Sequence, residues 1–183
     1  MYLGGVSNVT RRSEIWKPTE ALVRPDLPLP VMYHCMIATN YGTYSTGGYH
    51  TSEIQDTWFL AKNATEWIPG PTMINARYMH ACGSFEFDNV TVLIVTGGRK
   101  SKSTEILSLG LEDPSWQQGP ELPEDYEQNS HKIVSNGESL YYINTYTNVF
   151  LKLQCFESLE SCVWENQTQT KLSHPRKMSV ALM

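Results

Sequence analysis

The sequence lacks the features that mark membrane-spanning and nucleic-acid-binding proteins. No stretch approaches the roughly 20 apolar residues needed to cross a bilayer, and residues 1–5 show no charged segment leading into a long apolar one, so no signal peptide is recognised. Lys and Arg number 14 against 19 Asp and Glu, and the two signs are mixed along the chain. Without a basic patch we expect no nucleic-acid partner.

The short motifs of familiar catalytic chemistry are also missing. There is no P-loop, no G-x-G-x-x-G, no H-E-x-x-H and no Ser-His-Asp order. Four acidic residues, Glu121, Glu124, Asp125 and Glu127, cluster in a proline-containing loop. Such a cluster is typical of a solvated turn rather than of an acid/base pair. We therefore predict a chain that is not an enzyme and has no cofactor.

What the sequence does contain is a repeat. Trp67, Trp116 and Trp164 follow one another at spacings of 49 and 48 residues. A glycine pair precedes each of the first two tryptophans, a Gly-Pro follows each of them, and a histidine comes later in each period. These landmarks are Gly47 and Gly48, Gly97 and Gly98, Gly70-Pro71, Gly119-Pro120, His34, His80 and His131. A period of this length indicates a propeller or a solenoid.

The residues of one unit explain the period physically. Residues 92–95 are continuously apolar, which is typical of a strand covered on both faces. Gly97 and Gly98 end that strand where the backbone must turn or crowd. Trp116 has a large apolar surface and an N–H that requires a partner, which suits a residue placed between adjacent sheets. The prolines that follow it mark the exit to the next unit.

The units divide the chain at 1–31, 32–76, 77–129, 130–175 and 176–183. The first and last are incomplete, so we expect a partial propeller of about four blades; a closed four-bladed ring in which residues 1–5 pair with 177–183 is the alternative. In the fourth unit, Asn144-Thr145 stands where the glycine pair belongs. The expected strands are 13–16, 21–23, 33–38, 44–48, 55–60, 66–67, 78–82, 92–95, 105–109, 132–134, 139–143, 149–153 and 163–164.

The same landmarks resemble those of the kelch-repeat β-propeller family. The resemblance rests on residues 92–98, 103–109, Trp116, 119–123 and the step from Arg77 to His80, and it extends over nearly the whole chain. It implies an all-β fold of four-stranded antiparallel blades and a non-enzymatic protein-protein interaction module. It leaves two alternatives: an intracellular adaptor that recruits substrates to a ubiquitin ligase, for which no BTB or F-box segment is present, and a copper oxidase, whose metal-binding residues have no match here.

The four cysteines predict one disulfide. Cys155 and Cys162 flank a short loop between two expected strands, where their Cα atoms can approach the roughly 5.5 Å that a disulfide requires. Two free surface thiols are the alternative. Cys35 and Cys82 are interpreted as buried, reduced residues, and neither pair has the spacing of a metal site.

Four Asn-x-Ser/Thr sequons add to the evidence on compartment. Together with the Cys155–Cys162 hairpin they favour a secreted protein or an ectodomain, with a cytoplasmic location as the alternative. The asparagines are Asn8, Asn63, Asn89 and Asn166.

The repeated histidines and the loop residues are the candidates for binding. His34, His80 and His131 share one position of the repeat, and we interpret each as a structural residue that bonds within its own blade rather than as part of a metal site. Loops on a rigid scaffold are where recognition usually lies. The predicted contact residues for a protein partner are Tyr49, His50, Arg99, Lys100, Lys102 and Tyr126.

Overall fold

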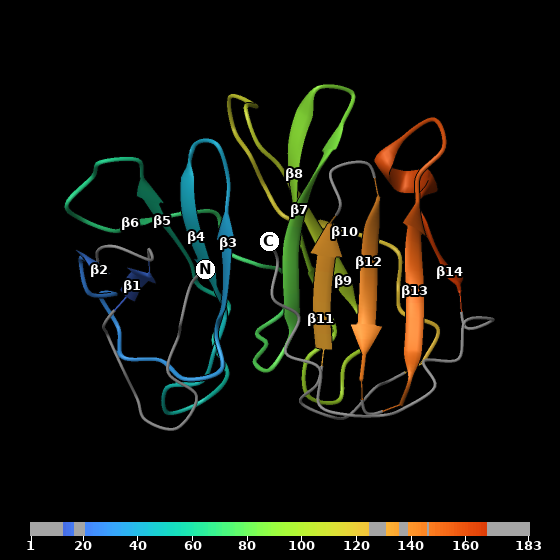
Figure 1. The fold of residues 1–183 in the computed structure, drawn as a ribbon, viewed down its shortest axis with the longest axis horizontal. Coiled ribbons are helices and arrows are strands. Elements are labelled where there is room, and N and C mark those ends of the chain that lie inside the picture. Colours follow the sequence, from blue (N-terminus) through green and yellow to red (C-terminus); the bar gives the residue numbers. More distant parts are fainter. Residues whose placement is uncertain (1–12, 17–20, 125–130, 136–138, 146, 168–183) are drawn as a thin grey trace.

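The computed structural model describes residues 13–16, 21–124, 131–135, 139–145 and 147–167. This part of the chain is almost entirely β-structure, arranged as three four-stranded antiparallel sheets and one two-stranded sheet (Figure 1). The only helix within it is a short 3-10 turn, Leu159–Ser161. The strands are β1 Ser13–Trp16, β2 Ala21–Arg24, β3 Cys35–Ala38, β4 Gly42–Thr46, β5 Thr57–Ala61, β6 Ile68–Pro69, β7 Ala81–Phe87, β8 Val90–Thr96, β9 Thr104–Ser108, β10 Gln117–Gln118, β11 His131–Ser135, β12 Leu140–Asn144, β13 Val149–Gln154 and β14 Val163–Asn166.

Each four-stranded sheet is a meander in which strands that follow one another in sequence lie side by side. The orders are β3-β4-β5-β6, β7-β8-β9-β10 and β11-β12-β13-β14. Antiparallel neighbours need only short connections, so each sheet uses one continuous segment of chain. The all-β class and the four-stranded antiparallel sheets predicted from the repeat are confirmed, and the arrangement is compatible with a partial propeller.

The sheets pack face to face with apolar residues between them. One cluster joins Ile37 and Tyr44 of the β3–β6 sheet to Leu93 and Trp116 of the β7–β10 sheet. Another joins the opposite face of the β7–β10 sheet, through Val92, to the β11–β14 sheet. The middle sheet is thus covered on both sides, which is why residues 92–95 are completely buried.

The first strands of successive sheets also pack against one another. β7 contacts both β3 and β11, and the three strands stand next to each other in the centre of Figure 1. Gly83 on β7 makes part of this contact possible, because a Cβ built there would lie 2.5 Å from Ile133 Cγ2 on β11. The sheets are therefore close together along their first strands.

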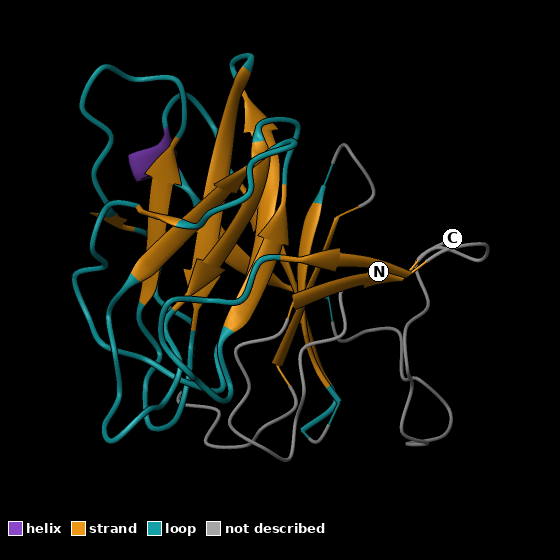
Figure 2. Ribbon diagram, turned by 90° about the vertical axis from the view of Figure 1, so that its left-hand side faces the viewer, coloured by secondary structure: helices purple, strands orange, loops and turns teal. Residues whose placement is uncertain are grey.

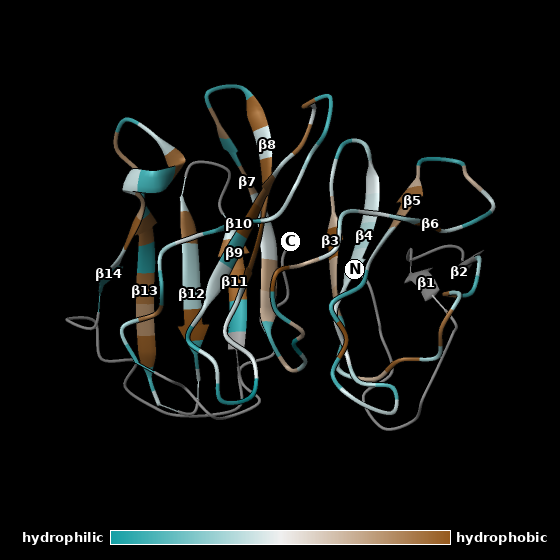
Figure 3. Ribbon diagram, turned by 180° about the vertical axis from the view of Figure 1, so that it is seen from behind, coloured by the Kyte–Doolittle hydropathy of each residue, from teal (hydrophilic) through white to brown (hydrophobic). Residues whose placement is uncertain are grey.

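Loops gather at two opposite ends of the strands (Figure 2). At one end, here called the double-glycine end, β4 and β8 stop and Gly47, Gly48, Gly97 and Gly98 follow. At the opposite end, here called the hairpin end, the turn residues Asp88 and Asn89 connect β7 to β8. In Figures 1 and 3 the hairpin end is uppermost.

Some strand boundaries differ from the sequence-based expectation. The strand expected at 78–82 begins at Ala81 and continues to Phe87. Gly47 and Gly48, expected inside the strand 44–48, lie beyond the end of β4, whereas Gly97 and Gly98 follow the end of β8 as predicted. Trp67 and Trp116 precede the two-residue strands β6 and β10. The predicted pairing of residues 1–5 with 177–183 lies outside the described residues. No helix in the described segments has the length and apolar character of a membrane span.

Candidate functional site

The three repeated tryptophans connect each sheet to the chain one unit earlier. The Nε1–H groups of Trp67, Trp116 and Trp164 donate to backbone carbonyls at 2.8, 3.0 and 2.9 Å. The acceptors are Pro25, Pro71 and Pro120. All three indoles are buried, so each indole contributes apolar area while its polar N–H is satisfied. The predicted position between adjacent sheets is confirmed for Trp116 and Trp164, which lie in clusters shared by two sheets. Trp67 packs instead with Leu27 and Val31 of the segment before its own sheet.

The glycine pairs allow two loops to meet at the double-glycine end. Gly47 has φ of 53°, and a Cβ there would lie 2.4 Å from the carbonyl oxygen of Arg77. Gly98 has φ of 116°, and a Cβ would lie 3.0 Å from the carbonyl oxygen of Tyr78. Glycine fits such positions without a steric penalty. The linker before β7 can therefore run directly against both loops.

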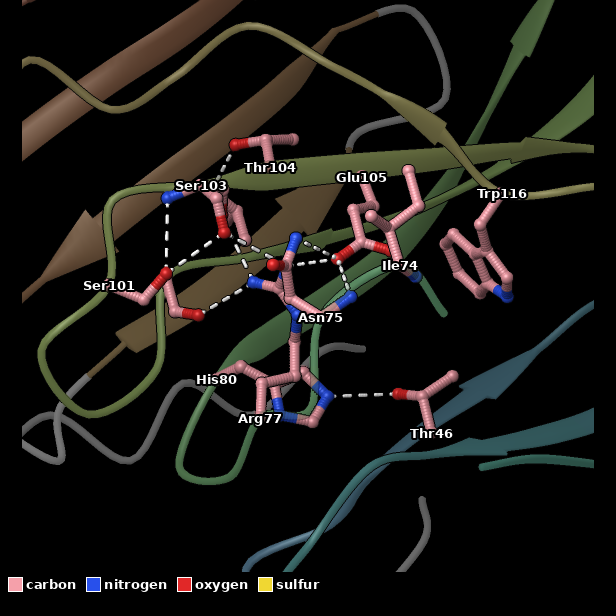
Figure 4. A network of polar contacts seen from close by, with 12 residues as sticks. Thr46, Ile74, Asn75, Arg77, His80, Ser101, Ser103, Thr104, Glu105 and Trp116 are labelled. Atoms are coloured by element: carbon pink, nitrogen blue, oxygen red, sulfur yellow. Dashed lines mark hydrogen bonds and ion pairs between the residues drawn. The ribbon is translucent and has the colours of Figure 1, made fainter. Parts of the chain in front are cut away.

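A buried ion pair fixes that linker from the other side (Figure 4). Arg77 and Glu105 are 2% and 0% exposed and form a salt bridge. Glu105 Oε2 accepts from the backbone N–H of Ile74 at 2.7 Å, and Oε1 accepts from the backbone N–H of Asn75 at 3.0 Å. Arg77 Nη1 also donates to the Gly97 carbonyl at 2.8 Å. Because both carboxylate oxygens are occupied by protein donors, this pair has a structural role and no free acid or base.

The histidine in this linker bonds to the preceding sheet. His80 Nε2 lies 2.9 Å from Thr46 Oγ1 at the end of β4, so the interpretation that each repeated histidine bonds within its own unit is wrong for His80. The reason is that the loop before β7 packs on the end of β4. Burial lowers the pKa of His34, and the side chain of His131 lies outside the described residues.

In the described ranges, no group of three or more His, Cys, Asp or Glu residues is placed to hold a metal ion.

At the double-glycine end the loops bring three tyrosines and an arginine together. The Tyr78 ring is 6.2 Å from that of Tyr33 and 5.3 Å from that of Tyr49. Arg99 Nη1 donates to Tyr78 Oη at 2.7 Å. Tyr33 and Tyr49 come from loops around β3 and β4, whereas Tyr78 and Arg99 come from loops around β7 and β8. We call these four residues the tyrosine cluster.

The backbone holds the tyrosine cluster in place. Tyr49 N donates to the Met32 carbonyl at 2.8 Å, and Met32 N donates back to Tyr49 at 3.0 Å. Met79 N donates to the Tyr33 carbonyl at 3.0 Å. Tyr33 and Met79 both have φ of 57°, a conformation that non-glycine residues rarely adopt and that surrounding contacts must maintain. Tyr78 is 6% exposed, whereas Tyr33 and Tyr49 are half-buried and Arg99 is exposed.

The predicted contact residues divide between this cluster and its surroundings. Tyr49 and Arg99 belong to it. His50 Nδ1 lies 2.9 Å from the Pro30 carbonyl, and Lys100 is exposed. Lys102 forms an exposed salt bridge to Glu121 at 2.7 Å, whose hydrogen bond raises the pKa of Lys102.

Some of the predicted loop residues lie outside the described part of the chain, and two members of the tyrosine cluster were not predicted. Tyr126, Asp125 and Glu127 lie outside the described residues, while Glu124 is exposed in its loop. Tyr33 and Tyr78, interpreted from the sequence as the first residues of strands, are the members that sequence reasoning missed. Their positions just before the repeated histidines are the signal that indicates a shared location.

Two disulfides are present. The predicted Cys155–Cys162 bond connects the end of β13 to the start of β14. The interpretation of Cys35 and Cys82 as reduced thiols is wrong, because they are bonded to each other with a Cα separation of 6.0 Å. Their sequence separation of 47 is about one repeat, which places them on the neighbouring first strands β3 and β7. Disulfides are more typical of extracellular proteins than of intracellular ones.

Three of the four sequon asparagines lie in the described part of the chain, and all three are exposed. Asn63 and Asn89 have positive φ in loops of the hairpin end, whereas Asn166 ends β14. Asn8 lies outside the described residues. The backbone therefore leaves these three positions accessible.

Fold and site together define a class: an all-β protein of packed, repeated four-stranded sheets that presents an aromatic cluster on its loops. No protein-family model matches this chain, and no curated protein has a matching sequence.

Proposed function

We propose that this chain is a non-enzymatic protein-interaction module built on a kelch-type β-propeller. The observation that carries the proposal is the tyrosine cluster, which assembles Tyr33, Tyr49, Tyr78 and Arg99 from loops of two neighbouring sheets. Tyrosine and arginine are enriched where proteins bind one another, because each combines a large contact area with hydrogen-bonding groups.

The rigidity of the cluster supports the same role. The ion pair of Arg77 with Glu105, the glycine pairs and the Cys35–Cys82 disulfide fix the loops before a partner arrives. A preorganised surface loses less conformational freedom on binding than a mobile one. Arg99 and Lys100 are exposed at its edge, where they can contact carboxylates or backbone carbonyls of a partner.

The kelch assignment and the compartment belong to the proposal as well. The landmarks of the repeat support the kelch type, and the two disulfides with three exposed sequon asparagines support an extracellular glycoprotein. Glycans on Asn63 and Asn89 would occupy the hairpin end and leave the tyrosine cluster uncovered.

The proposal is tested by screening the secreted chain against an array of purified extracellular proteins. Each protein that binds is then measured with the variants Tyr49→Ala and Arg99→Ala. We expect at least one interaction whose affinity falls by about tenfold in both variants, as for hot-spot residues. The matched control is Tyr41→Ala, since Tyr41 is 53% exposed in a loop at the hairpin end. Binding that is weakened equally by Tyr41→Ala, or by neither cluster variant, would place the interaction elsewhere.

A further inference from the structure

The loop between β13 and β14 holds one aromatic side chain out in solvent. Phe156 is 67% exposed, more than the other exposed large hydrophobic side chains in the described residues. Single exposed apolar residues are ordinary on protein surfaces. Phe156 differs because a disulfide and several hydrogen bonds restrain the loop that carries it.

A disulfide and a set of hydrogen bonds fix the loop. Cys155 and Cys162 close it at its base. The hydroxyl of Ser161 accepts from the backbone N–H groups of Phe156 and Ser158, both at 3.2 Å, and donates to the Ser158 carbonyl at 2.6 Å. The backbone of Phe156 is therefore held in one place before any contact is made.

Other apolar residues of the loop are packed against the protein, whereas Phe156 is exposed. Leu159 and Cys155 pack against the cluster between the β7–β10 and β11–β14 sheets, and Cys162 is 5% exposed. Phe156 is not among the residues that pack against that cluster. Val163, the residue after Cys162, is 44% exposed, so two exposed apolar side chains lie one residue from either end of the same disulfide.

The charged side chains of the 155–162 loop are all acidic. Glu157 and Glu160 are exposed in the loop, and residues 155–162 include no Lys, Arg or His. Among the described residues, the other loops of the hairpin end carry the exposed acids Glu66, Asp88, Glu112 and Asp113 and one exposed cation, Lys62. Such a field attracts a basic partner and repels an anionic one.

We propose that the 155–162 loop is a second docking surface, in which Phe156 enters an apolar pocket on a protein partner whose rim carries Lys or Arg. Phe156 and Val163 supply the apolar contact, and Glu157 and Glu160 pair with the rim. Aromatic anchors that fill pockets contribute much of the binding energy of interfaces, and a side chain on a preorganised loop loses less freedom on binding. This surface is separate from the tyrosine cluster, which lies at the opposite end of the strands.

The test uses the full chain, secreted with both disulfides formed, and a phage-displayed library of random dodecapeptides as the probe. Peptides are selected on the unsubstituted chain and then measured against Phe156→Ser, Glu157→Gln/Glu160→Gln and Leu111→Ser. Leu111 is the matched control, because it is 56% exposed in another loop of the same end. Thermal unfolding checks that each variant is folded.

We expect the selected peptides to carry an apolar residue beside Lys or Arg. Their binding should weaken by about tenfold in Phe156→Ser, weaken in the glutamine variant at low salt, and stay unchanged in Leu111→Ser and in Tyr49→Ala. The inference is overturned if no peptide is enriched, if the peptides bind Phe156→Ser equally well, or if they lack basic residues. Binding of the chain to phosphatidylserine vesicles that depends on Phe156 would also overturn it, since the acidic rim would then not select the partner.

Discussion

The buried pair of Arg77 and Glu105 is the residue-scale feature that most constrains the double-glycine end. It connects the linker before β7 to strand β9 through the backbone N–H groups of Ile74 and Asn75. Two charges removed from water are tolerated only when hydrogen bonds replace the lost hydration. Both residues have those bonds here, so the loss of either partner leaves the other charged and buried.

The first prediction concerns Glu105→Gln. This variant keeps the shape of the side chain but leaves Arg77 without a counter-charge, and we expect the free energy of unfolding to fall by about 3 kcal/mol. Urea denaturation measures it. The same substitution at Glu121, whose salt bridge with Lys102 is exposed, should leave the midpoint unchanged because exposed pairs contribute little. Equal effects at the two positions would contradict the structural role of the buried pair.

At the scale of single residues, the sequence shows which residues recur in the repeat more readily than it shows which residues they contact. The repeated tryptophans, glycine pairs and the Cys155–Cys162 disulfide follow from spacing, because each depends on a local or periodic signal. The partners of Glu105 and His80 depend on how one sheet meets the next, and residue spacing does not contain that geometry. Likewise, nothing in the identity of Tyr33 predicts its positive φ.

At the scale of elements, β7 has a special position because it contacts the first strands on both sides. Cys82 bonds it to β3, and Gly83 leaves space for Ile133 of β11. Adjacent residues of one strand therefore serve the two neighbouring sheets. A side chain at position 83 would push β11 away from β7.

The second prediction is that Gly83→Ala lowers the free energy of unfolding by about 1–3 kcal/mol through overpacking. The added Cβ would lie 2.5 Å from Ile133 Cγ2, a distance that requires movement. A double-mutant cycle with Ile133→Ala is the control, because the shorter side chain at 133 removes the conflict. The combined loss should be smaller than the sum of the single losses, and additive losses would show that the two positions do not compete for space.

The strands themselves were largely predictable from the sequence. Alternating and continuous apolar runs gave the central strands of each sheet, since burial of one or both faces imposes that pattern. The ends were less predictable. The expected strand at 78–82 starts at Ala81, because the buried Tyr78 packs in the tyrosine cluster and Met79 has a positive φ. Contacts with the preceding sheet determine this difference.

At the scale of the whole molecule, the two disulfides differ in what they connect. Cys155–Cys162 closes a loop between adjacent strands, with a sequence separation of 7, whereas Cys35–Cys82 joins two sheets across a separation of 47. In the chain-entropy description the unfolded state is restricted more by the longer loop. The Cys35–Cys82 bond should therefore contribute more to the association of the sheets.

The third prediction compares the two bonds by paired substitution to alanine. Cys35→Ala/Cys82→Ala should lower the free energy of unfolding by about 4 kcal/mol, and Cys155→Ala/Cys162→Ala by about 2 kcal/mol. Urea denaturation under non-reducing conditions measures both, and each pair serves as the control for the other. An equal or reversed order would mean that the inter-sheet bond adds strain that offsets its effect.

The tyrosine cluster was predictable only in part, because it depends on how neighbouring sheets pack together. Tyr49 and Arg99 could be predicted as contact residues because they directly follow the glycine pairs, which mark loops. Their neighbours Tyr33 and Tyr78 come from segments 16 to 66 residues away in sequence, and the packing of one sheet on another brings them together. Without the relative placement of the sheets, the four residues have no visible connection.

The bonds from Trp67, Trp116 and Trp164 to prolines of the preceding exit segments have a bearing on how such a chain gains or loses units over evolutionary time. In the described residues, units 32–76 and 77–129 each bring an indole donor for the preceding unit and a carbonyl acceptor for the following one. An in-phase duplication therefore inserts a matched donor and acceptor, whatever its breakpoint within the period, and existing neighbours need no new chemistry. Duplication of a whole unit thus preserves the contacts between neighbouring units, whereas an unrelated insertion between two units would leave an indole N–H without its acceptor.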